Sequence, residues 1–293
     1  MKRAGPLLLA VVPLVLTAVA CSGEPDGKAG PTAARPYDES GSAADGRTDD
    51  ARVAALPPGL AAPAKRELAF KLVSSAENST LDWRGQYGYV EDIGDGRGYT
   101  AGLIGFCTGT HDLLELVETY TERHPGNGLA RYLPALRAVD GSASHRGLGR
   151  GFVRAWKAEA REPAFRAAQD AARDRRYFDP AVRLAKLDGL GTLGQFVYYD
   201  AMVVHGPGSG PKSFHGLRGA ALAKARTPAE GGDETAYLHA FLDVRREVMK
   251  SERAHRDTSR IDTAQRRFLR EGNLALRTPL TWRVYGDAYR VAK

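Results

Sequence analysis

Apolar side chains recur at helical spacing along most of the chain after about residue 64. Between residues 66 and 76, Leu68, Leu72 and Val73 fall on one stripe, which predicts a helix ending close to Glu77. The same spacing predicts helices over residues 110–124, 129–139, 152–161, 163–176, 180–187, 192–204, 215–225, 233–255 and 263–274.

One stretch departs from the helical pattern. Residues 86–91 and 99–106 are rich in side chains that favour β-strands. The glycine-rich run between them, residues 94–98, predicts a tight turn that carries Asp95. Many helices with one small inserted sheet are typical of an α+β fold.

Residues 1–20 have the pattern of an export signal. A positive start precedes an apolar run, residues 7–19, that is too short to span a bilayer, and Ala18-Val19-Ala20 is a small-residue cleavage site. Cys21 then resembles the lipid-attachment cysteine of bacterial lipoproteins, whereas ordinary cleavage would leave it free or remove it. We therefore expect an extracellular protein, secreted or tethered to the outer face of the cytoplasmic membrane through Cys21.

Residues 21–63 are rich in Gly, Pro, Ala, Ser and Asp and have almost no large apolar side chain before Leu56. Such a segment buries too little surface to offset its ordering entropy, so we predict a disordered tether. Residues 64–293 are long enough for one sizeable or two-lobed folded unit. Cys107 is the one cysteine within it, so no disulfide is possible there, and we expect a small buried side chain rather than a nucleophile.

The balance of charges narrows the possible partners. Lys and Arg number 42 against 35 Asp and Glu, giving a net charge of +7, but the cations are dispersed along the chain. Together with export, this dispersion argues against nucleic-acid binding. The seven histidines show no metal-ligand spacing, so we expect neither a metal site nor a cofactor.

Two carboxylates in small, polar surroundings stand out as an acid and base pair. Glu77 lies at the carboxyl end of a predicted helix, where the helix dipole and a neighbouring apolar wall would favour a stored proton. Asp95 lies in the glycine-rich turn, where Arg97 can keep it ionised, although Glu91 and Asp92 are rivals for the role. One protonated and one ionised carboxyl group are what hydrolysis of a glycosidic bond requires.

Three motifs resemble the chitosanases of glycoside hydrolase family 46: Ser75 to Ser79, Glu91 to Thr100 and Ile104 to Thr110. The resemblance runs from about Glu67 to the end of the chain. It implies a lysozyme-like architecture in which two mostly helical lobes, one with a small sheet, flank a cleft. It also implies endo-hydrolysis of chitosan, the β-1,4-linked polymer of glucosamine, with inversion at the anomeric carbon.

The resemblance assigns roles to particular positions. Glu77 matches the general acid, Asp95 the general base, and Thr100 the threonine that positions the attacking water. Asp112 matches an aspartate that recognises the substrate amine, although it could simply complement the dipole at a helix start. Tyr89 could present its ring to a sugar or fill the core of the hairpin.

Four further charged positions correspond to a buried network behind the base in this family: Asp200, Arg245, Glu252 and Arg260. Asp200 interrupts the apolar run 192–204, and a buried charge requires a partner. We expect this network to hold Arg97, itself a substrate-binding candidate, together with the Asp95 turn.

Two alternative functions remain open. The same architecture could serve a muramidase that cuts peptidoglycan, or a surface sugar-binding module without catalysis. A binder has no use for an acid, and Asp112 favours an amino sugar without acetyl groups. Because both the chain and a glucosamine polymer are cationic, carboxylates in the cleft must provide the local attraction. We expect the enzyme to act as a monomer.

Overall fold

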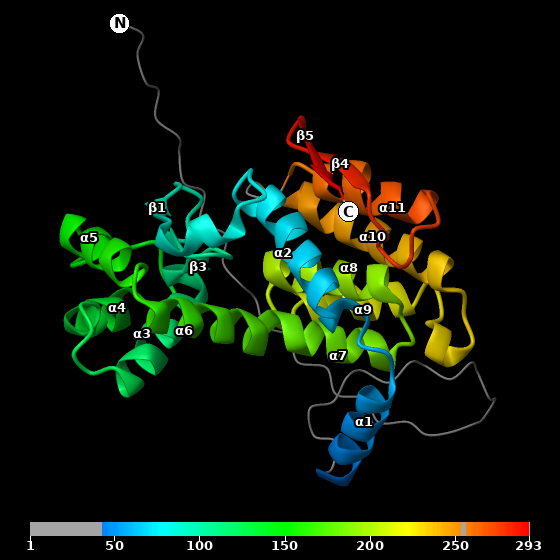
Figure 1. The fold of residues 1–293 in the computed structure, drawn as a ribbon, viewed down its shortest axis with the longest axis horizontal. Coiled ribbons are helices and arrows are strands. Elements are labelled where there is room, and N and C mark those ends of the chain that lie inside the picture. Colours follow the sequence, from blue (N-terminus) through cyan, green and yellow to red (C-terminus); the bar gives the residue numbers. More distant parts are fainter. Residues whose placement is uncertain (1–42, 253–255, 293) are drawn as a thin grey trace, which may run out of the picture. The chain divides into compact units, whose positions relative to one another are not determined.

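Most of the helices predicted from the hydrophobic pattern are present. The computed structural model describes residues 43–252 and 256–292, all of which belong to one unit, residues 35–293 (Figure 1). The predicted export signal and Cys21 lie outside the described residues. No helix within these residues is both long and apolar enough to cross a membrane.

The predicted disordered tether is wrong for its second half. Helix α1 (Ala43–Ala55) is followed by a short 3-10 helix, η1 (Gly59–Ala61), and then by α2 (Pro63–Glu77). The tether prediction counted large apolar side chains, whereas α1 is rich in alanine, the best helix former. α1 packs beside α7 (Asp179–Leu187), and Arg183 Nε lies 2.9 Å from Asp50 Oδ1.

A three-stranded antiparallel sheet begins the first lobe. Its strands, in spatial order, are β1 (Val90–Asp92), β2 (Tyr99–Ala101) and β3 (Phe106–Cys107). Thr100 in the middle strand pairs with Glu91 on one side and Cys107 on the other.

The first predicted strand starts later than expected. Residues 86–88 belong to a 3-10 helix, η2 (Trp83–Gly88), which Asp82 caps by accepting the Gly85 N–H at 3.1 Å. This turn buries Trp83 and Tyr87 together. Burial of these aromatic rings outweighs the strand preference of the local sequence.

Helices cover the sheet in the first lobe. They are η3 (Thr108–Thr110), α3 (Asp112–Arg123), η4 (Ala130–Tyr132), α4 (Leu133–Val139), α5 (Arg150–Glu159) and α6 (Pro163–Arg173). Trp156 of α5 and Phe165 of α6 are fully buried, with ring centroids 5.0 Å apart. The Trp156 indole N–H donates to the backbone oxygen of Tyr87 at 3.0 Å, which fixes η2 against this core.

One long helical rod connects the two lobes. α6 continues through a π-helical segment, η5 (Asp174–Phe178), into α7 (Asp179–Leu187), so the two helices predicted on either side of Pro180 run together (Figure 1). Pro180 is the second residue of α7 and follows the π-helical segment closely.

The second lobe is built around α8 (Thr192–His205), which is buried from Leu193 to Met202. The elements that follow it in the chain are α9 (Phe214–Leu222), η6 (Pro228–Glu230), α10 (Glu234–Ser251), η7 (Arg260–Gln265) and α11 (Arg266–Arg270). α2 (Pro63–Glu77) also packs against α8, which brings its carboxyl end into this lobe.

The sequence analysis missed a C-terminal hairpin, β4 (Leu280–Val284) and β5 (Asp287–Val291). Trp282 on β4 is buried, and its indole N–H donates to Ser75 Oγ at 2.9 Å. The hairpin is therefore fastened to the last turns of α2, two residues before Glu77.

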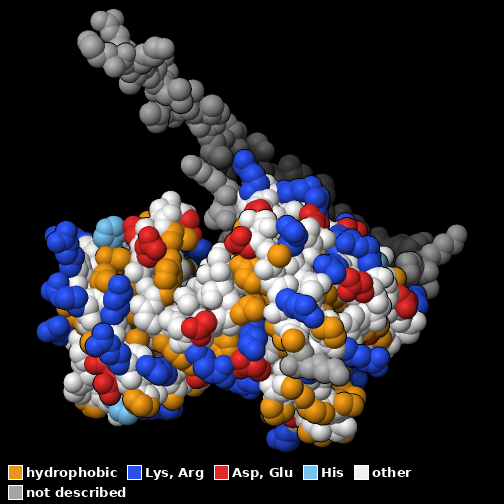
Figure 2. All heavy atoms as spheres, turned by 45° about the horizontal axis from the view of Figure 1, so that its top comes forward, with side chains coloured by type: hydrophobic (Ala, Val, Ile, Leu, Met, Phe, Trp, Pro, Cys, Tyr) orange, Lys and Arg blue, Asp and Glu red, His pale blue; other side chains and the backbone are white. Residues whose placement is uncertain are grey.

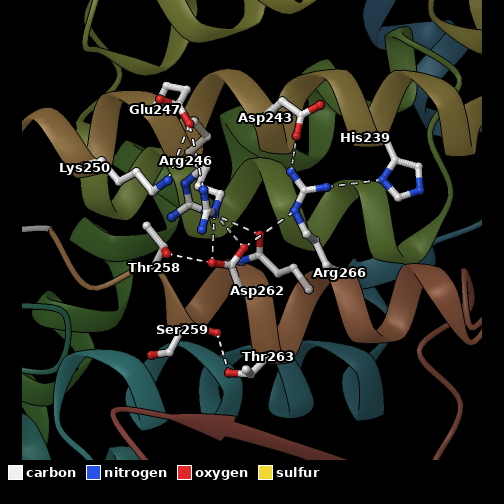
Figure 3. A network of polar contacts seen from close by, with 12 residues as sticks. His239, Asp243, Arg246, Glu247, Lys250, Thr258, Ser259, Asp262, Thr263 and Arg266 are labelled. Carbon is white, nitrogen blue, oxygen red and sulfur yellow. Dashed lines mark hydrogen bonds and ion pairs between the residues drawn. The ribbon is translucent and has the colours of Figure 1, made fainter.

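Ion pairs join α10 to the segment that follows it (Figure 3). Asp262 on η7 accepts from Arg246 Nε at 2.9 Å and from the Thr258 hydroxyl at 2.7 Å, and Arg266 Nε lies 3.7 Å away. These contacts hold η7 against α10, and the first residue of η7 is Arg260.

Candidate active site

A cavity of about 660 Å³ is lined by residues of both lobes. The predicted residues that it brings together are Glu77, Arg97, Thr100, Asp112 and Glu252. Unexpected polar neighbours in its lining are Arg176, Tyr177, His205 and Lys212. Another hollow, of about 890 Å³, lies beside α1 and α7 and contains none of the predicted site residues among its lining.

Glu77 is the last residue of α2 and keeps 26% of its side chain exposed. Its Oε1 lies 2.7 Å from Arg260 Nη2. The expectation of an apolar wall missed the polar partner of Glu77, which is a buried guanidinium. The error arose because Arg260 is far from Glu77 in sequence and reaches it only through the packing of η7.

Asp200, Arg245 and Arg260 form a buried ionic network. Asp200 Oδ2 lies 2.7 Å from Arg245 Nη1, and Asp200 Oδ1 lies 2.9 Å from Arg260 Nη2. Gln265 donates to Asp200 Oδ2 at 2.6 Å. With Glu77, the cluster holds two guanidinium groups and two carboxyl groups, and each buried guanidinium contacts the Asp200 carboxylate, as burial requires.

The network holds Asp200 ionised. Burial alone would raise the pKa of Asp200, but the neighbouring guanidinium groups of Arg260 and Arg245 outweigh it and lower that pKa. Burial also acts against the charge of Arg260, yet Asp200 and Glu77 together raise the pKa of that guanidinium. Asp200 and Arg260 are therefore both charged at neutral pH.

The network does not lie where it was predicted. It contacts the expected acid, Glu77, whereas the partner of Arg97 is Asp95. Glu252 directly follows α10 and lines the cavity, with its Oε1 3.7 Å from Lys212 Nζ. The charge pattern showed that Asp200 needed partners, but the identity of the contacted carboxylate depends on how η7 packs against α2.

Asp95 lies in the turn between β1 and β2. Gly94, Gly96 and Gly98 all have positive φ, at 70°, 89° and 70°. Arg97 Nη2 and Nε lie 2.7 and 2.8 Å from Asp95 Oδ2, and the Arg97 backbone N–H donates to Oδ1 at 3.0 Å. The predicted pairing of Asp95 with Arg97 is confirmed, and it leaves 11% of the Asp95 side chain exposed.

The neighbouring element η3 pins this turn. The Arg97 backbone oxygen accepts from the Gly109 N–H at 2.9 Å and from the Thr108 hydroxyl at 3.2 Å. A Cβ atom added to Gly98 would lie 2.2 Å from Thr108 Oγ1, so only glycine fits. The position of Asp95 therefore depends on the close approach of the Gly98 backbone to Thr108.

Thr100 lines the cavity from β2 and is 8% exposed. Its Oγ1 lies 3.3 Å from Cys107 Sγ. Cys107 is buried and donates to the Gly105 backbone oxygen at 3.1 Å, and burial raises the pKa of its thiol. The prediction of a buried, unreactive cysteine agrees with these surroundings.

Asp112 is the first residue of α3 and is nearly buried on the cavity wall. Its Oδ1 accepts from the Cys107 N–H at 2.8 Å and the Thr110 hydroxyl at 2.7 Å, and its Oδ2 accepts from the Tyr177 hydroxyl at 2.7 Å. Burial raises the pKa of Asp112 more than these hydrogen bonds lower it. Its carboxylate is thus fixed in position and faces a cavity.

Tyr89 lies elsewhere. It is half-buried and its hydroxyl donates to Glu91 Oε2 at 3.3 Å. It lines a separate hollow between η2 and α5. Asp92, a rival for the base, accepts from the Gly94 N–H at 2.9 Å and lies 3.5 Å from His145 Nδ1. Among the described residues, the lining of the 660 Å³ cavity includes none of Glu91, Asp92 and Asp95, but Asp95 contacts the cavity residue Arg97.

Sequence reasoning missed the contribution of η5 and of the end of α8. Arg176 and Tyr177 point at the cavity from a π-helical segment, for which the sequence carried no recognised signal. His205 ends α8, and its Nε2 lies 3.3 Å from Arg245 Nε. Gly206 and the Gly/Pro loop after it did mark the end of that helix, but not its position at a cavity.

Known proteins share this sequence and this fold. The family model described as Glycosyl hydrolase family 46 matches residues 71–280. A chitosanase from a Streptomyces strain is 63% identical over 231 residues, which cover 79% of this chain and 83% of that protein. A chitosanase from Bacillus subtilis is 42% identical over 226 residues, covering 74% and 80%.

Solved structures agree with the sequence comparisons. A chitosanase crystallised with substrate matches with a TM-score of 0.79 at 60% identity, covering 80% of this chain and 98% of that one. The family 46 chitosanase of Gynuella sunshinyii in complex with chitotetraose matches with a TM-score of 0.72 at 33% identity, covering 78% and 97%. The predicted α+β, mostly helical, lysozyme-like fold is confirmed. This chain belongs to glycosyl hydrolase family 46.

Proposed function

We propose that this protein is an endo-acting chitosanase that hydrolyses chains of β-1,4-linked glucosamine with inversion at the anomeric carbon. The observation that carries the proposal is the placement of two carboxylates, each beside its own arginine. Glu77 pairs with Arg260 at the end of α2, and Asp95 pairs with Arg97 in the β1–β2 turn. Inverting glycosidases need an acid and a base on opposite sides of the sugar.

Glu77 is the general acid in this mechanism. Its proton passes to the glycosidic oxygen as the bond from that oxygen to the anomeric carbon breaks. The hydrogen bond from Arg260 Nη2 at 2.7 Å restricts the rotation of the Glu77 carboxyl group. A fixed acid loses less orientational freedom on reaching the transition state.

Asp95 is the general base. It accepts a proton from a water molecule whose oxygen attacks the anomeric carbon from the face opposite the leaving group. Arg97 pairs with Asp95, and the Thr100 hydroxyl, on the adjacent strand, orients the water. Because Arg97 covers Asp95 and itself lines the cavity, substrate must shift this side chain, or the two lobes must close, before the water is engaged.

Carboxylates on the cavity wall select the cationic substrate. Asp112 and Glu252 both line the cavity, so each can attract the ammonium group of a glucosamine unit. Burial of Asp112 strengthens its field, because a low local dielectric screens charge poorly. The relatives named chitosanase favour this substrate over peptidoglycan, and an acid at Glu77 favours catalysis over binding alone.

The same proposal extends to location. The apolar run and small-residue site in residues 1–20 support export, and Cys21 supports a lipid tether to the outer face of the cytoplasmic membrane. We expect the enzyme to act there as a monomer, since the acid, the base and the cavity belong to one chain.

Release of reducing ends tests the activity. Wild-type protein is incubated with chitosan and, separately, with peptidoglycan, and Glu77→Gln is compared with a matched control, Glu271→Gln, an exposed position 48% open to solvent. We expect release from chitosan, lowered about 10²- to 10⁴-fold by Glu77→Gln and unchanged in the control. Release from peptidoglycan alone supports the muramidase, and no release from either supports the binding module.

A further inference from the structure

One face of α5 carries a stripe of cations. Arg150, Arg154, Lys157 and Arg161 follow one another at intervals of four, three and four residues. This spacing places them on one side of a helix, with Arg161 two residues past the end of α5. All four are exposed, whereas Trp156 on the opposite side is buried in the core.

Further cations flank the stripe. Arg131 and Arg154 line a hollow of about 760 Å³ between η4 and α5. Lys157 and Arg161 line a second hollow, of about 620 Å³, between η2 and α5. Figure 2 shows Lys and Arg side chains gathered over the end of the molecule where α5 lies. We call the four stripe residues and Arg131 the basic face.

The cations of the basic face form no ion pairs within the described residues, although Glu91 lines the same hollow as Lys157 and Arg161. Elsewhere in the same lobe the pattern differs: Arg137 lies 2.7 Å from Glu118, and Arg176 lies 2.7 Å from Glu115. Like charges spaced along one helix repel one another, so this arrangement lowers stability unless an anion occupies it.

The cationic substrate cannot be that occupant, since a protonated glucosamine chain is repelled by this face. A lipid bilayer is also a poor fit. Interfacial helices insert large apolar side chains beside their cations. The large apolar side chains exposed in the described part of the chain are Leu56, Ile93 and Tyr285, and none belongs to α5.

We propose that the basic face binds a linear phosphodiester polymer. Successive stripe residues are separated by three or four residues, which is about 5 Å along the helix axis. A row of cations at that spacing can follow the repeated charges of an extended chain, and guanidinium forks bind phosphate oxygens bidentately. The hollows on either side leave room for the chain to pass beside α5.

This second site lies on the first lobe and uses none of the residues assigned to hydrolysis. It would hold the enzyme on a polyanionic surface, which is where a polycationic substrate accumulates. The inference does not depend on the proposed function, because the basic face can bind a polyanion whether or not the cavity cleaves chitosan.

Binding is tested with the full chain and fluorescently labelled poly(glycerol phosphate), followed by anisotropy at low and increasing NaCl. The test variant replaces the four stripe cations: Arg150→Gln, Arg154→Gln, Lys157→Gln and Arg161→Gln. A control variant removes the same total charge, from three arginines and one lysine at exposed positions in the other lobe. Its substitutions are Lys224→Gln, Arg226→Gln, Arg270→Gln and Arg277→Gln.

We expect the stripe variant to bind at least about tenfold more weakly and the control to stay within about threefold of wild type. The slope of log K against log[NaCl] should become shallower by about 3 in the stripe variant, since each lost phosphate contact removes about 0.7. Both variants should hydrolyse a short glucosamine oligomer as wild type does, which shows that they are folded. If the fourfold variant does not fold, the single variants Arg154→Gln and Lys157→Gln are compared with wild type instead. Each should lose part of the affinity for poly(glycerol phosphate).

Three results would overturn the proposal. Wild-type protein could fail to bind poly(glycerol phosphate) even at low salt. The stripe and control variants could lose equal affinity, which would make the effect one of net charge. Binding that depends on the stripe could appear only with phosphatidylglycerol vesicles, which would make the partner a membrane.

Discussion

Arg260 Nη2 lies 2.7 Å from Glu77 Oε1, and the same nitrogen lies 2.9 Å from Asp200 Oδ1. One guanidinium group therefore connects the exposed end of α2 with a charge cluster buried in the second lobe. The Arg260 side chain is 5% exposed, so solvent screens these contacts little. The proposed acid is held by a residue 183 positions away in the chain, through the packing of η7.

Replacement of Arg260 by lysine should separate positioning from substrate binding. An ammonium group is a point charge without the planar fork, so it cannot hold Glu77 and Asp200 in the same way. We expect Arg260→Lys to lower kcat about 10- to 100-fold while KM changes less than about threefold, because misplacement affects the transition state. Arg267→Lys, at an exposed pair with Glu271, is the control. Unchanged kcat in Arg260→Lys would contradict this role.

Two adjacent arginines on α10 offer a matched test of the buried network. Arg245 is fully buried and pairs with Asp200, whereas Arg246 pairs with Asp262 near the surface (Figure 3). Arg245→Ala leaves a buried carboxylate without its partner, which typically costs about 3–5 kcal/mol. Urea unfolding should show this loss for Arg245→Ala and little change in the midpoint for Arg246→Ala. Equal midpoints for the two variants would show that the buried pair does not stabilise the fold.

The stability that Asp200 contributes should depend on pH. Its folded-state pKa is lowered, so its contribution is fully present above the unfolded value of about 3.9 and is lost as pH falls through the folded value. Calorimetry should therefore find a large Tm difference between wild type and Asp200→Asn at about pH 6, narrowing towards pH 2. A gap that stays constant over this range would mean that Asp200 is not ionised in the folded protein.

Two glycines in the turn that carries Asp95 differ in one respect. Gly96 and Gly98 both have positive φ, but a Cβ at Gly98 would meet Thr108 at 2.2 Å whereas one at Gly96 meets open space. Both alanine variants share the backbone strain of about 1–2 kcal/mol, so their difference isolates the clash. We expect Gly98→Ala to lower kcat at least about tenfold more than Gly96→Ala, because the clash displaces Asp95. Similar kcat values would show that the turn tolerates the shift.

The sequence predicted elements where local pattern and packing agree. The apolar run around Asp200 correctly predicted a buried helix and a buried charge that needs partners. The alternation of Leu280, Trp282 and Val284 indicates a strand. It was overlooked because the prediction relied on helical spacing in this half of the chain. The alanines of α1 favour a helix, but they were overlooked because such small side chains do not indicate a hydrophobic core.

Contacts between distant segments could not be predicted in this way. The pairing of Arg97 with Asp95 is local and was recognised, since only Gly96 separates them in the chain. The pairing of Arg260 with Glu77 depends on how η7, α2 and the C-terminal hairpin pack. For the same reason, Tyr177 could not be assigned to the Asp112 carboxylate, which it reaches from a π-helical segment.

The central claim is that Glu77 protonates the leaving oxygen while water activated by Asp95 attacks from the opposite face. Proton magnetic resonance of the sugar formed in the first minutes of digestion, before mutarotation, tests it most directly. An inverting reaction on a β-linked glucosamine chain must release the α-anomer first. A first product in the β-configuration would show that configuration is retained and would contradict the assignment of Asp95 as a base acting through water.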